Sequence, residues 1–148
     1  MSAPLEALAL IRSSEGLSLK AYLCPAGKWT IGYGHTEGVT SGMVIDAAAA
    51  EALLVADVAE LARHIDELVT VTLTTNQRSA LLSFVYNVGL KAFARSRLLK
   101  TLNSGDIAAV PAELKRWVYS RGRILNGLVV RRAREAALWV REPTMEVK

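Results

Sequence analysis

Cysteine and aromatic residues are scarce in this chain of 148 residues, and it has no long hydrophobic run. Its single cysteine, Cys24, has no partner for an internal disulfide, so the chain suits a reducing compartment or is indifferent to redox state. No apolar run approaches the roughly 20 residues of a membrane-spanning helix, which argues against a transmembrane protein. The apolar stretch at residues 4–11 is short and contains Glu6, so we expect no signal peptide.

Hydrophobic residues make up 51% of the chain, which excludes intrinsic disorder and fits one domain with two lobes. Charge is distributed unevenly: residues 1–74 carry 4 basic and 9 acidic residues, whereas residues 75–148 carry 14 basic and 5 acidic residues. This asymmetry suggests a polyanionic partner for the second half, either nucleic acid or an anionic polymer of the cell envelope. The competing interpretation is a solvated basic face with no specific partner.

The distribution of apolar residues predicts an α+β fold, with a small sheet near the N-terminus followed by helices. Pro25 and several glycines interrupt an aromatic and β-branched stretch at residues 19–36, which is typical of a hairpin or a three-stranded sheet. The longest helical pattern covers residues 45–69, with Asp46 as a cap, and should join the two lobes. Further helices are expected at residues 3–14, 75–88 (capped by Thr74 or Thr75), 95–103 (ended by Gly105), 106–119 and 128–140.

Three residues around the expected hairpin are candidates for chemistry. Glu15 ends the first helix, where the negative end of the helix dipole favours a protonated carboxyl, as a general acid requires; the alternative is an ordinary helix-end glutamate. Cys24 and Thr30 could equally be a small buried side chain and an ordinary strand residue. His35 has no second histidine or cysteine at ligand spacing, so we expect no metal site and no cofactor.

The spacing of these residues, taken together, indicates a particular protein family more specifically than any one of them does. Glu15, Cys24 and Thr30 follow the pattern Glu-x8-Cys-x5-Thr within EGLSLKAYLCPAGKWTIGYGHT, and further motifs follow as SFVYNVG, AFARSRLL, RWVY and GLVVRRA. The chain resembles the phage-type lysozymes, the endolysin family of glycoside hydrolase family 24, over nearly its whole length, and most closely those of phages with Gram-negative hosts. It departs from the family in carrying Cys24 where Asp is common, and we expect no signal-arrest segment, which some relatives carry.

The resemblance implies a lysozyme-like fold and an activity. The sheet lobe would cover about residues 15–44, the interlobe helix about 45–69, and the helical lobe about 70–148 together with helix 3–14. The enzyme would hydrolyse the β-1,4 bond between N-acetylmuramic acid and N-acetylglucosamine in peptidoglycan with inversion. Glu15 would be the acid, and Cys24 and Thr30 would flank the attacking water.

The resemblance also implies roles for residues outside this triad. Thr36, Tyr86 and Ser96 are candidates for sugar binding, although Tyr86 could be core and Ser96 a helix cap. His35 should contact Asp57 in a supporting role. Either Arg131 or Arg132 would approach the catalytic glutamate.

Two other functions stay open at this level. A lytic transglycosylase would use Glu15 alone and form 1,6-anhydromuramoyl ends, and a basic nucleic-acid-binding module would leave the hairpin motif unexplained. For an endolysin we expect a monomer that binds peptidoglycan and no nucleic acid, has no membrane anchor, and is held in the host cytoplasm. A separate holin would then release it to the periplasm.

Overall fold

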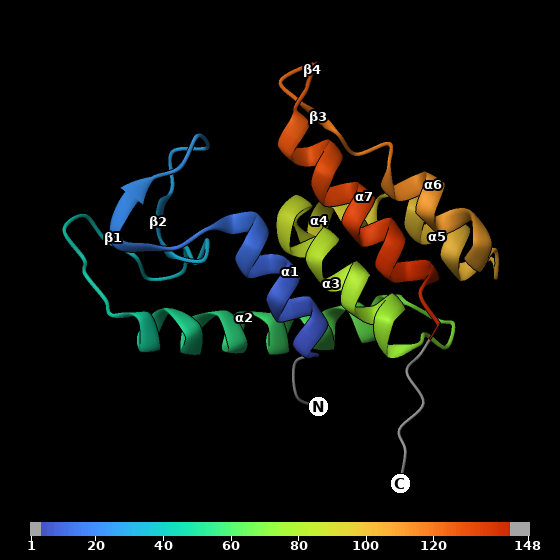
Figure 1. Ribbon diagram of the computed structural model, residues 1–148, viewed down its shortest axis with the longest axis horizontal. Helices are drawn as coiled ribbons and strands as arrows, with labels where there is room; N and C mark the ends of the chain where they lie inside the picture. Colours follow the sequence, from blue (N-terminus) through green and yellow to red (C-terminus); the bar gives the residue numbers. More distant parts are fainter. Residues whose placement is uncertain (1–3, 143–148) are drawn as a thin grey trace, which may run out of the picture. The chain divides into compact units, whose positions relative to one another are not determined.

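The computed structural model describes residues 4–142, which form helices and two small antiparallel sheets, as the α+β prediction requires (Figure 1). The chain divides into two compact units, the first ending at Glu60 and the second beginning at Leu61. This border lies within a single helix, α2 (Ala47–Leu68). The lobe boundaries expected from the sequence remain a prediction.

The first unit contains helix α1 (Leu5–Glu15) and a hairpin of strands β1 (Ser18–Leu23) and β2 (Trp29–Gly32). The strands pair antiparallel, with Tyr22 opposite Thr30, and the register shifts between Ser18 and Tyr22. The sheet is therefore a two-stranded hairpin, to which an isolated bridge between Lys20 and Val44 adds one contact. Helix α1 buries three apolar side chains: Ala7, Leu8 and Ile11.

The long helix α2 begins where the sequence predicts, because the carboxylate of Asp46 caps it. The Asp46 Oδ1 atom accepts a 2.7 Å hydrogen bond from the backbone N–H of Ala49, one of the donors that a helix start leaves without a partner. Its buried residues recur at three and four positions, as one helix face requires: Ala50, Leu54, Val58, Ala62 and Ile65.

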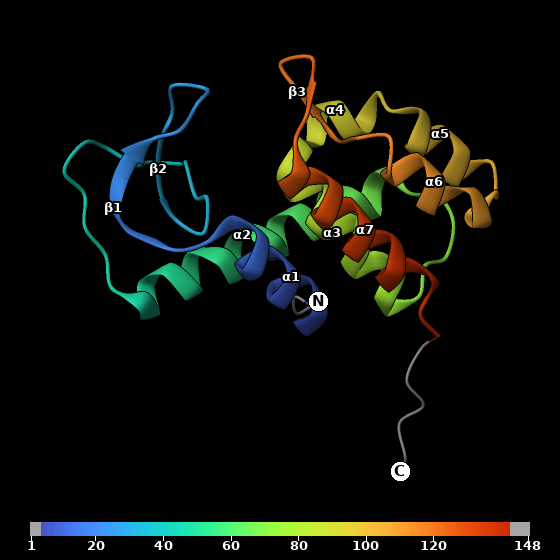
Figure 2. The ribbon, with the colours of Figure 1, turned by 45° about the horizontal axis from the view of Figure 1, so that its top comes forward.

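In the second unit, helices α3 (Thr75–Val88) and α7 (Asn126–Val140) pack against each other (Figure 2). Thr74 caps α3 in a capping box: its hydroxyl accepts from the Gln77 N–H at 3.1 Å, and the Gln77 side chain accepts from the Thr74 N–H at 2.9 Å. The remaining elements are short: α4 (Leu90–Ala94), α5 (Arg97–Asn103), η1 (Ile107–Ala109) and α6 (Val110–Leu114). Phe84 lies edge-on to both Phe93 and Trp117 in the core of this unit.

The prediction of a continuous helix over residues 106–119 is wrong. Helix α6 ends at Leu114, and the chain then forms a second hairpin of β3 (Tyr119–Ser120) and β4 (Arg123–Ile124). The turn between these strands has φ 51° at Arg121 and φ 76° at Gly122. Two consecutive positive φ values suit the tight turn of a two-residue hairpin loop and are incompatible with a helix.

The helix expected over 95–103 is also shorter, since it begins at Arg97 after the cap residue Ser96. Among the described residues, no helix combines the length and the hydrophobicity that crossing a membrane would need.

Candidate active site

Glu15 is the last residue of α1 and is half-buried. Gly16 ends the helix with φ 72°, a conformation that a glycine adopts without strain, and β1 begins two residues later. One turn before Glu15, the Arg12 guanidinium binds the Glu51 carboxylate of α2 through Nε, at 3.1 and 3.0 Å, and through Nη2. This ion pair fixes the end of α1 that carries Glu15 against α2.

Cys24 and Thr30 lie together at the closed end of the first hairpin. The Lys28 carbonyl accepts from the Cys24 N–H at 2.9 Å and from the Thr30 hydroxyl at 3.0 Å, and the Cys24 carbonyl accepts from the Gly27 N–H at 2.8 Å. Thr30 is almost fully buried, with 3% of its surface exposed, whereas Cys24 is half-buried. The tight turn therefore brings the second and third residues of the predicted triad side by side.

The surroundings of Cys24 favour its thiolate. A hydrogen bond with the Lys28 backbone lowers the pKa of the thiol, and a hydrogen bond with the Thr30 hydroxyl lowers this pKa further. The Thr30 hydroxyl has one hydrogen, which it can give to the Lys28 carbonyl beside a neutral thiol or to the sulfur of a thiolate. The pair can thus accept a hydrogen bond from a water molecule in either protonation state.

His35 makes the contact that the resemblance implies. Its Nδ1 atom lies 2.7 Å from Asp57 Oδ2 on α2, and its Nε2 atom lies 2.8 Å from the Glu37 carbonyl oxygen. Both ring nitrogens face acceptors, so a ring with two N–H groups satisfies both contacts. The backbone of His35 pairs with Ile31, one residue after Thr30, which links this anchor to the strand that carries Thr30.

Arg131 and Arg132 belong to a buried charge cluster in the second unit, together with Ser83 and Glu135. Arg131 Nη2 donates to the Ser83 carbonyl at 2.9 Å, and the Ser83 hydroxyl donates to Glu135 Oε2 at 2.6 Å. Arg132, which is completely buried, donates from Nη1 to Glu135 Oε1 at 2.5 Å. Burial raises the pKa of Glu135, while the two arginines and Ser83 oppose this rise.

The three residues predicted to bind sugar have different environments. Thr36 is exposed and Tyr86 is half-buried. Ser96 is buried and caps α5: its hydroxyl accepts from the Leu99 N–H at 3.0 Å and donates to the Phe93 carbonyl at 2.7 Å. The structure thus shows the capping role that the sequence left open for Ser96, and the sugar-binding roles remain predictions.

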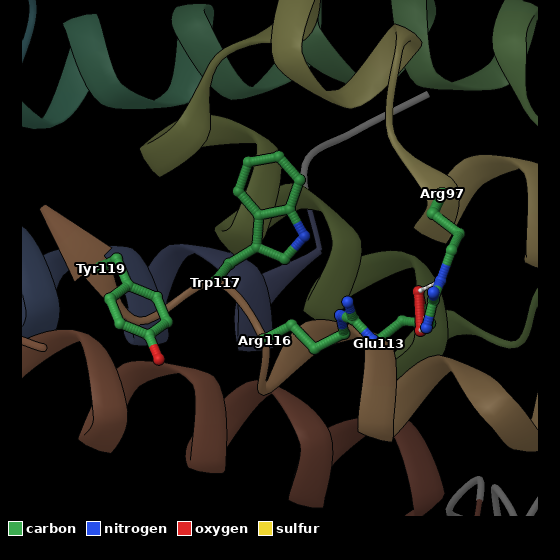
Figure 3. Close-up of a pocket in the computed structure, with 5 residues that line it drawn as sticks. All are labelled: Arg97, Glu113, Arg116, Trp117 and Tyr119. Carbon is green, nitrogen blue, oxygen red and sulfur yellow. Dashed lines mark hydrogen bonds and ion pairs between the residues drawn. The ribbon is translucent and has the colours of Figure 1, made fainter. Parts of the chain in front are cut away.

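Nothing in the sequence indicates the open pocket of about 290 Å³ that lies in the second unit (Figure 3). Arg97 and Glu113 form a two-pronged ion pair at 2.8 and 2.9 Å on one side, which lowers the pKa of Glu113, and Arg116, Trp117 and Tyr119 complete the lining. The Arg116 side chain forms no hydrogen bond or ion pair with any residue that the structure describes. A cation beside two aromatic rings suits an anionic or carbohydrate ligand.

The described part of the chain holds no cluster of three or more His, Cys, Asp or Glu residues that could bind a metal ion. Glu15, Cys24 and Thr30 supply a carboxyl group, a thiol and a hydroxyl. Such a set can transfer a proton and hold a water molecule.

Comparison with known proteins identifies the family. The phage lysozyme family model matches residues 12–135. An endolysin of Acyrthosiphon pisum secondary endosymbiont phage 1 is 45% identical over 136 residues, covering 89% of this chain and 93% of the relative. The endolysin of Bacillus phage PZA is 48% identical over 133 residues, and the match covers 88% of this chain but only 52% of that relative.

Solved structures agree on the fold. The muramidase domain of SpmX from Asticaccaulis excentricus superposes with a TM-score of 0.86 at 35% identity, covering 93% of this chain and 97% of that domain. The lysozyme-like fold expected from the sequence is therefore confirmed.

Proposed function

The chain belongs to the phage lysozyme family, and from that premise we propose how its own residues carry out the reaction. It is a lysozyme of the endolysin type, a muramidase that acts on bacterial peptidoglycan. We propose that it hydrolyses the β-1,4 bond between N-acetylmuramic acid and N-acetylglucosamine, with Glu15, Cys24 and Thr30 as the catalytic residues. The observation that supports this assignment is that the Cys24 backbone N–H and the Thr30 hydroxyl both donate to the Lys28 carbonyl, and that the Cys24 thiol also interacts with the Thr30 side chain, which brings a thiol and a hydroxyl together.

Glu15 protonates the glycosidic oxygen as the bond to the leaving sugar breaks. The remaining sugar ring acquires oxocarbenium character, and water attacks its anomeric carbon from the opposite face, which inverts the configuration. The chain offers a reason for Glu15 to stay in place during this transfer: the Arg12–Glu51 pair holds the last turn of α1.

Thr30 and Cys24 position the attacking water. With a neutral thiol, the Thr30 hydrogen goes to the Lys28 carbonyl and leaves the hydroxyl lone pairs to accept from the water, whose proton then passes to solvent as the new C–O bond forms. With a thiolate, the sulfur accepts instead and takes the proton that the water loses. The lowered pKa of Cys24 makes the thiolate more accessible than in a solvated cysteine, so a thiol can fill a position where relatives carry a carboxylate.

The supporting residues keep this geometry. His35 and Asp57 fasten the strand of Thr30 to α2, and the cluster around Arg131 and Arg132 stabilises the helices of the second unit. We propose that the enzyme acts at the cell wall as a monomer and binds no nucleic acid. It waits in the host cytoplasm until a separate holin lets it reach the periplasm.

Mass spectrometry of the products from purified peptidoglycan tests the reaction. Reducing muramic acid ends are expected from hydrolysis. Anhydromuramic ends would instead identify a transglycosylase, and the absence of soluble products would identify a binding module.

Glu15→Gln tests the acid. The amide cannot donate a proton at the required acidity, so the release of reducing ends should fall by at least about a thousandfold, near the upper part of the range for general acid catalysis. Glu60→Gln, which removes an exposed carboxyl group of α2, serves as the control and should keep full activity. A Glu15→Gln enzyme with more than a few per cent of wild-type activity would exclude this role.

A further inference from the structure

Asn87 is the second-last residue of α3 and is exposed at the surface, yet its side chain accepts a hydrogen bond from a buried residue. Its Oδ1 atom accepts a hydrogen bond from Nη2 of Arg132. Arg132 is 0% exposed, and it also donates to the Trp117 carbonyl at 3.0 Å and to Glu135 at 2.5 Å. Its guanidinium centre lies 4.8 Å from the centroid of the Phe84 ring.

These contacts determine how the Asn87 amide is oriented. A guanidinium group carries only donors, so the atom that faces it must be the amide oxygen. The NH2 group therefore points away from Arg132. Among the residues that the structure describes, none accepts a hydrogen bond from Asn87 Nδ2, which leaves two N–H donors at the surface in a fixed orientation.

Arg132 makes this orientation rigid. Three contacts and the Phe84 ring fix its guanidinium group, and burial prevents it from moving aside. A donor held in this way loses little conformational entropy when a ligand binds, and this improves affinity without an additional contact. An exposed asparagine without such an anchor would have to be ordered by the ligand.

The neighbourhood favours a carbohydrate or peptide ligand. Tyr86 precedes Asn87, and Arg132 binds the carbonyl of Trp117, one of the residues that line the pocket in Figure 3. A fixed N–H donor suits a ligand that carries amide carbonyl groups. Peptidoglycan has such carbonyls in its acetamido groups and in its stem peptides.

We propose that Asn87 is a substrate-binding residue that donates a hydrogen bond from Nδ2 to an amide carbonyl of peptidoglycan, and that Arg132 is the positioning residue that fixes it. This inference rests on the proposed function. It gives Arg132 a role in substrate affinity rather than in the chemical step.

Asn87→Asp is the decisive variant. A carboxylate keeps an acceptor for Arg132 and loses both donors, so the fold should be preserved while the bond to the substrate is lost. We expect KM for soluble peptidoglycan fragments to rise about 5- to 10-fold, the effect of losing about 1 kcal/mol or slightly more, with kcat and Tm unchanged. If Asn87 were only structural, the variant would bind like the wild type, because its contact with Arg132 is intact.

The added negative charge needs its own control. Measurements in about 1 M salt, where the Debye length is about 3 Å, suppress repulsion between the new carboxylate and an anionic substrate. The loss of a hydrogen bond should persist there. A KM within twofold of wild type at high salt would overturn the proposal.

Two altered substrates identify the carbonyl. If it belongs to an acetamido group, wild type and Asn87→Asp should have equal KM values on N-deacetylated peptidoglycan but not on glycan freed of its stem peptides. If it belongs to the peptide, the pattern should reverse. A difference that persists unchanged on both substrates would contradict the proposal. In every case reducing ends released by the wild type from intact peptidoglycan establish the reaction separately.

Discussion

At the scale of single residues, the Cys24 thiol and the Thr30 hydroxyl form the pair proposed to hold the attacking water. Hydrogen bonds with the Lys28 backbone and with the Thr30 side chain lower the pKa of the Cys24 thiol, and they outweigh the opposing effect of burial. A free thiol of pKa about 8.5 is only a few per cent ionised near neutrality, so even a modest fall in pKa increases the thiolate fraction several-fold.

Substitution of Cys24 measures how much of this chemistry is needed. Cys24→Asp should keep most of the activity, because a carboxylate can hold the same water. Cys24→Ala should lose at least about tenfold, since one of the two water partners disappears. The measurement is the rate of reducing-end release by the purified variants, and an alanine variant as active as the wild type would remove Cys24 from the mechanism.

The rate of alkylation at different pH values reports the ionisation of the Cys24 thiol. Because the pKa of the Cys24 thiol is lowered, its rate of reaction with iodoacetamide should reach half-maximum at a lower pH than that of a free cysteine peptide. Activity should be lost in step with the modification, and the Cys24→Asp enzyme should be resistant.

At the scale of elements, an ion pair connects α1 to α2. Arg12 lowers the pKa of Glu51, chiefly through their hydrogen bonds. A carboxyl group with a lowered folded pKa stabilises the fold above its unfolded pKa of about 4.3–4.5, and this stabilisation is lost as the pH falls through the folded value.

Glu51→Gln should therefore lower the free energy of unfolding at pH 7 by less than about 1 kcal/mol, since both side chains are about one-third exposed and solvent screens the pair. The difference from the wild type should be smaller at pH 3. Urea denaturation at the two pH values measures it, and an equal deficit at both would contradict the assignment.

Two glycines in different conformations, one in the turn of the second hairpin and one in α7, form a matched pair. Gly122 has φ 76°, so Gly122→Ala should cost about 1–2 kcal/mol of stability through backbone strain. Gly127 lies in the first turn of α7, where an added Cβ would meet no atom within 4 Å, so Gly127→Ala should stabilise by up to about 1 kcal/mol. Thermal unfolding of both variants distinguishes the two positions, and the same sign for both would be inconsistent with this turn geometry.

The same hairpin shows where sequence-based prediction stops. The long helices were predictable because their apolar positions repeat over several turns and because Asp46 and Thr74 mark their starts. Strands of two residues, such as β3 and β4, are too short to show any alternation, so the sequence does not indicate this hairpin, and the helix predicted over 106–119 runs to the first residue of β3.

The candidate site likewise contains residues that the sequence predicts and residues that it does not. Glu15, Cys24 and Thr30 could be found because their spacing is a property of the sequence. The anchoring of Asn87 by Arg132 could not, because it joins residues 45 positions apart and depends on burial that no local pattern reveals. The buried ion pairs of Glu135 could not be predicted either. Glu135 lies three and four residues after the two arginines, but exposed ion pairs on helices have the same spacing.

At the scale of the whole molecule, charge should guide the enzyme to its substrate. The second half of the chain is strongly basic, and opposite charges accelerate association with an anionic polymer. The initial rate on purified peptidoglycan should therefore fall several-fold between about 50 mM and 500 mM NaCl, through KM rather than kcat. Uncharged polyols at matched osmolarity are the control, and a rate independent of salt would show that long-range attraction plays no part.

The single cysteine also allows the enzyme to be quantified by chemical labelling. Since Cys24 is the only thiol in the chain and belongs to the proposed catalytic pair, one equivalent of a fluorescent electrophile marks one site. The label consumed before activity disappears would give the concentration of competent enzyme directly, as an active-site titration does. Preparations from different sources could then be compared per functioning molecule rather than per milligram.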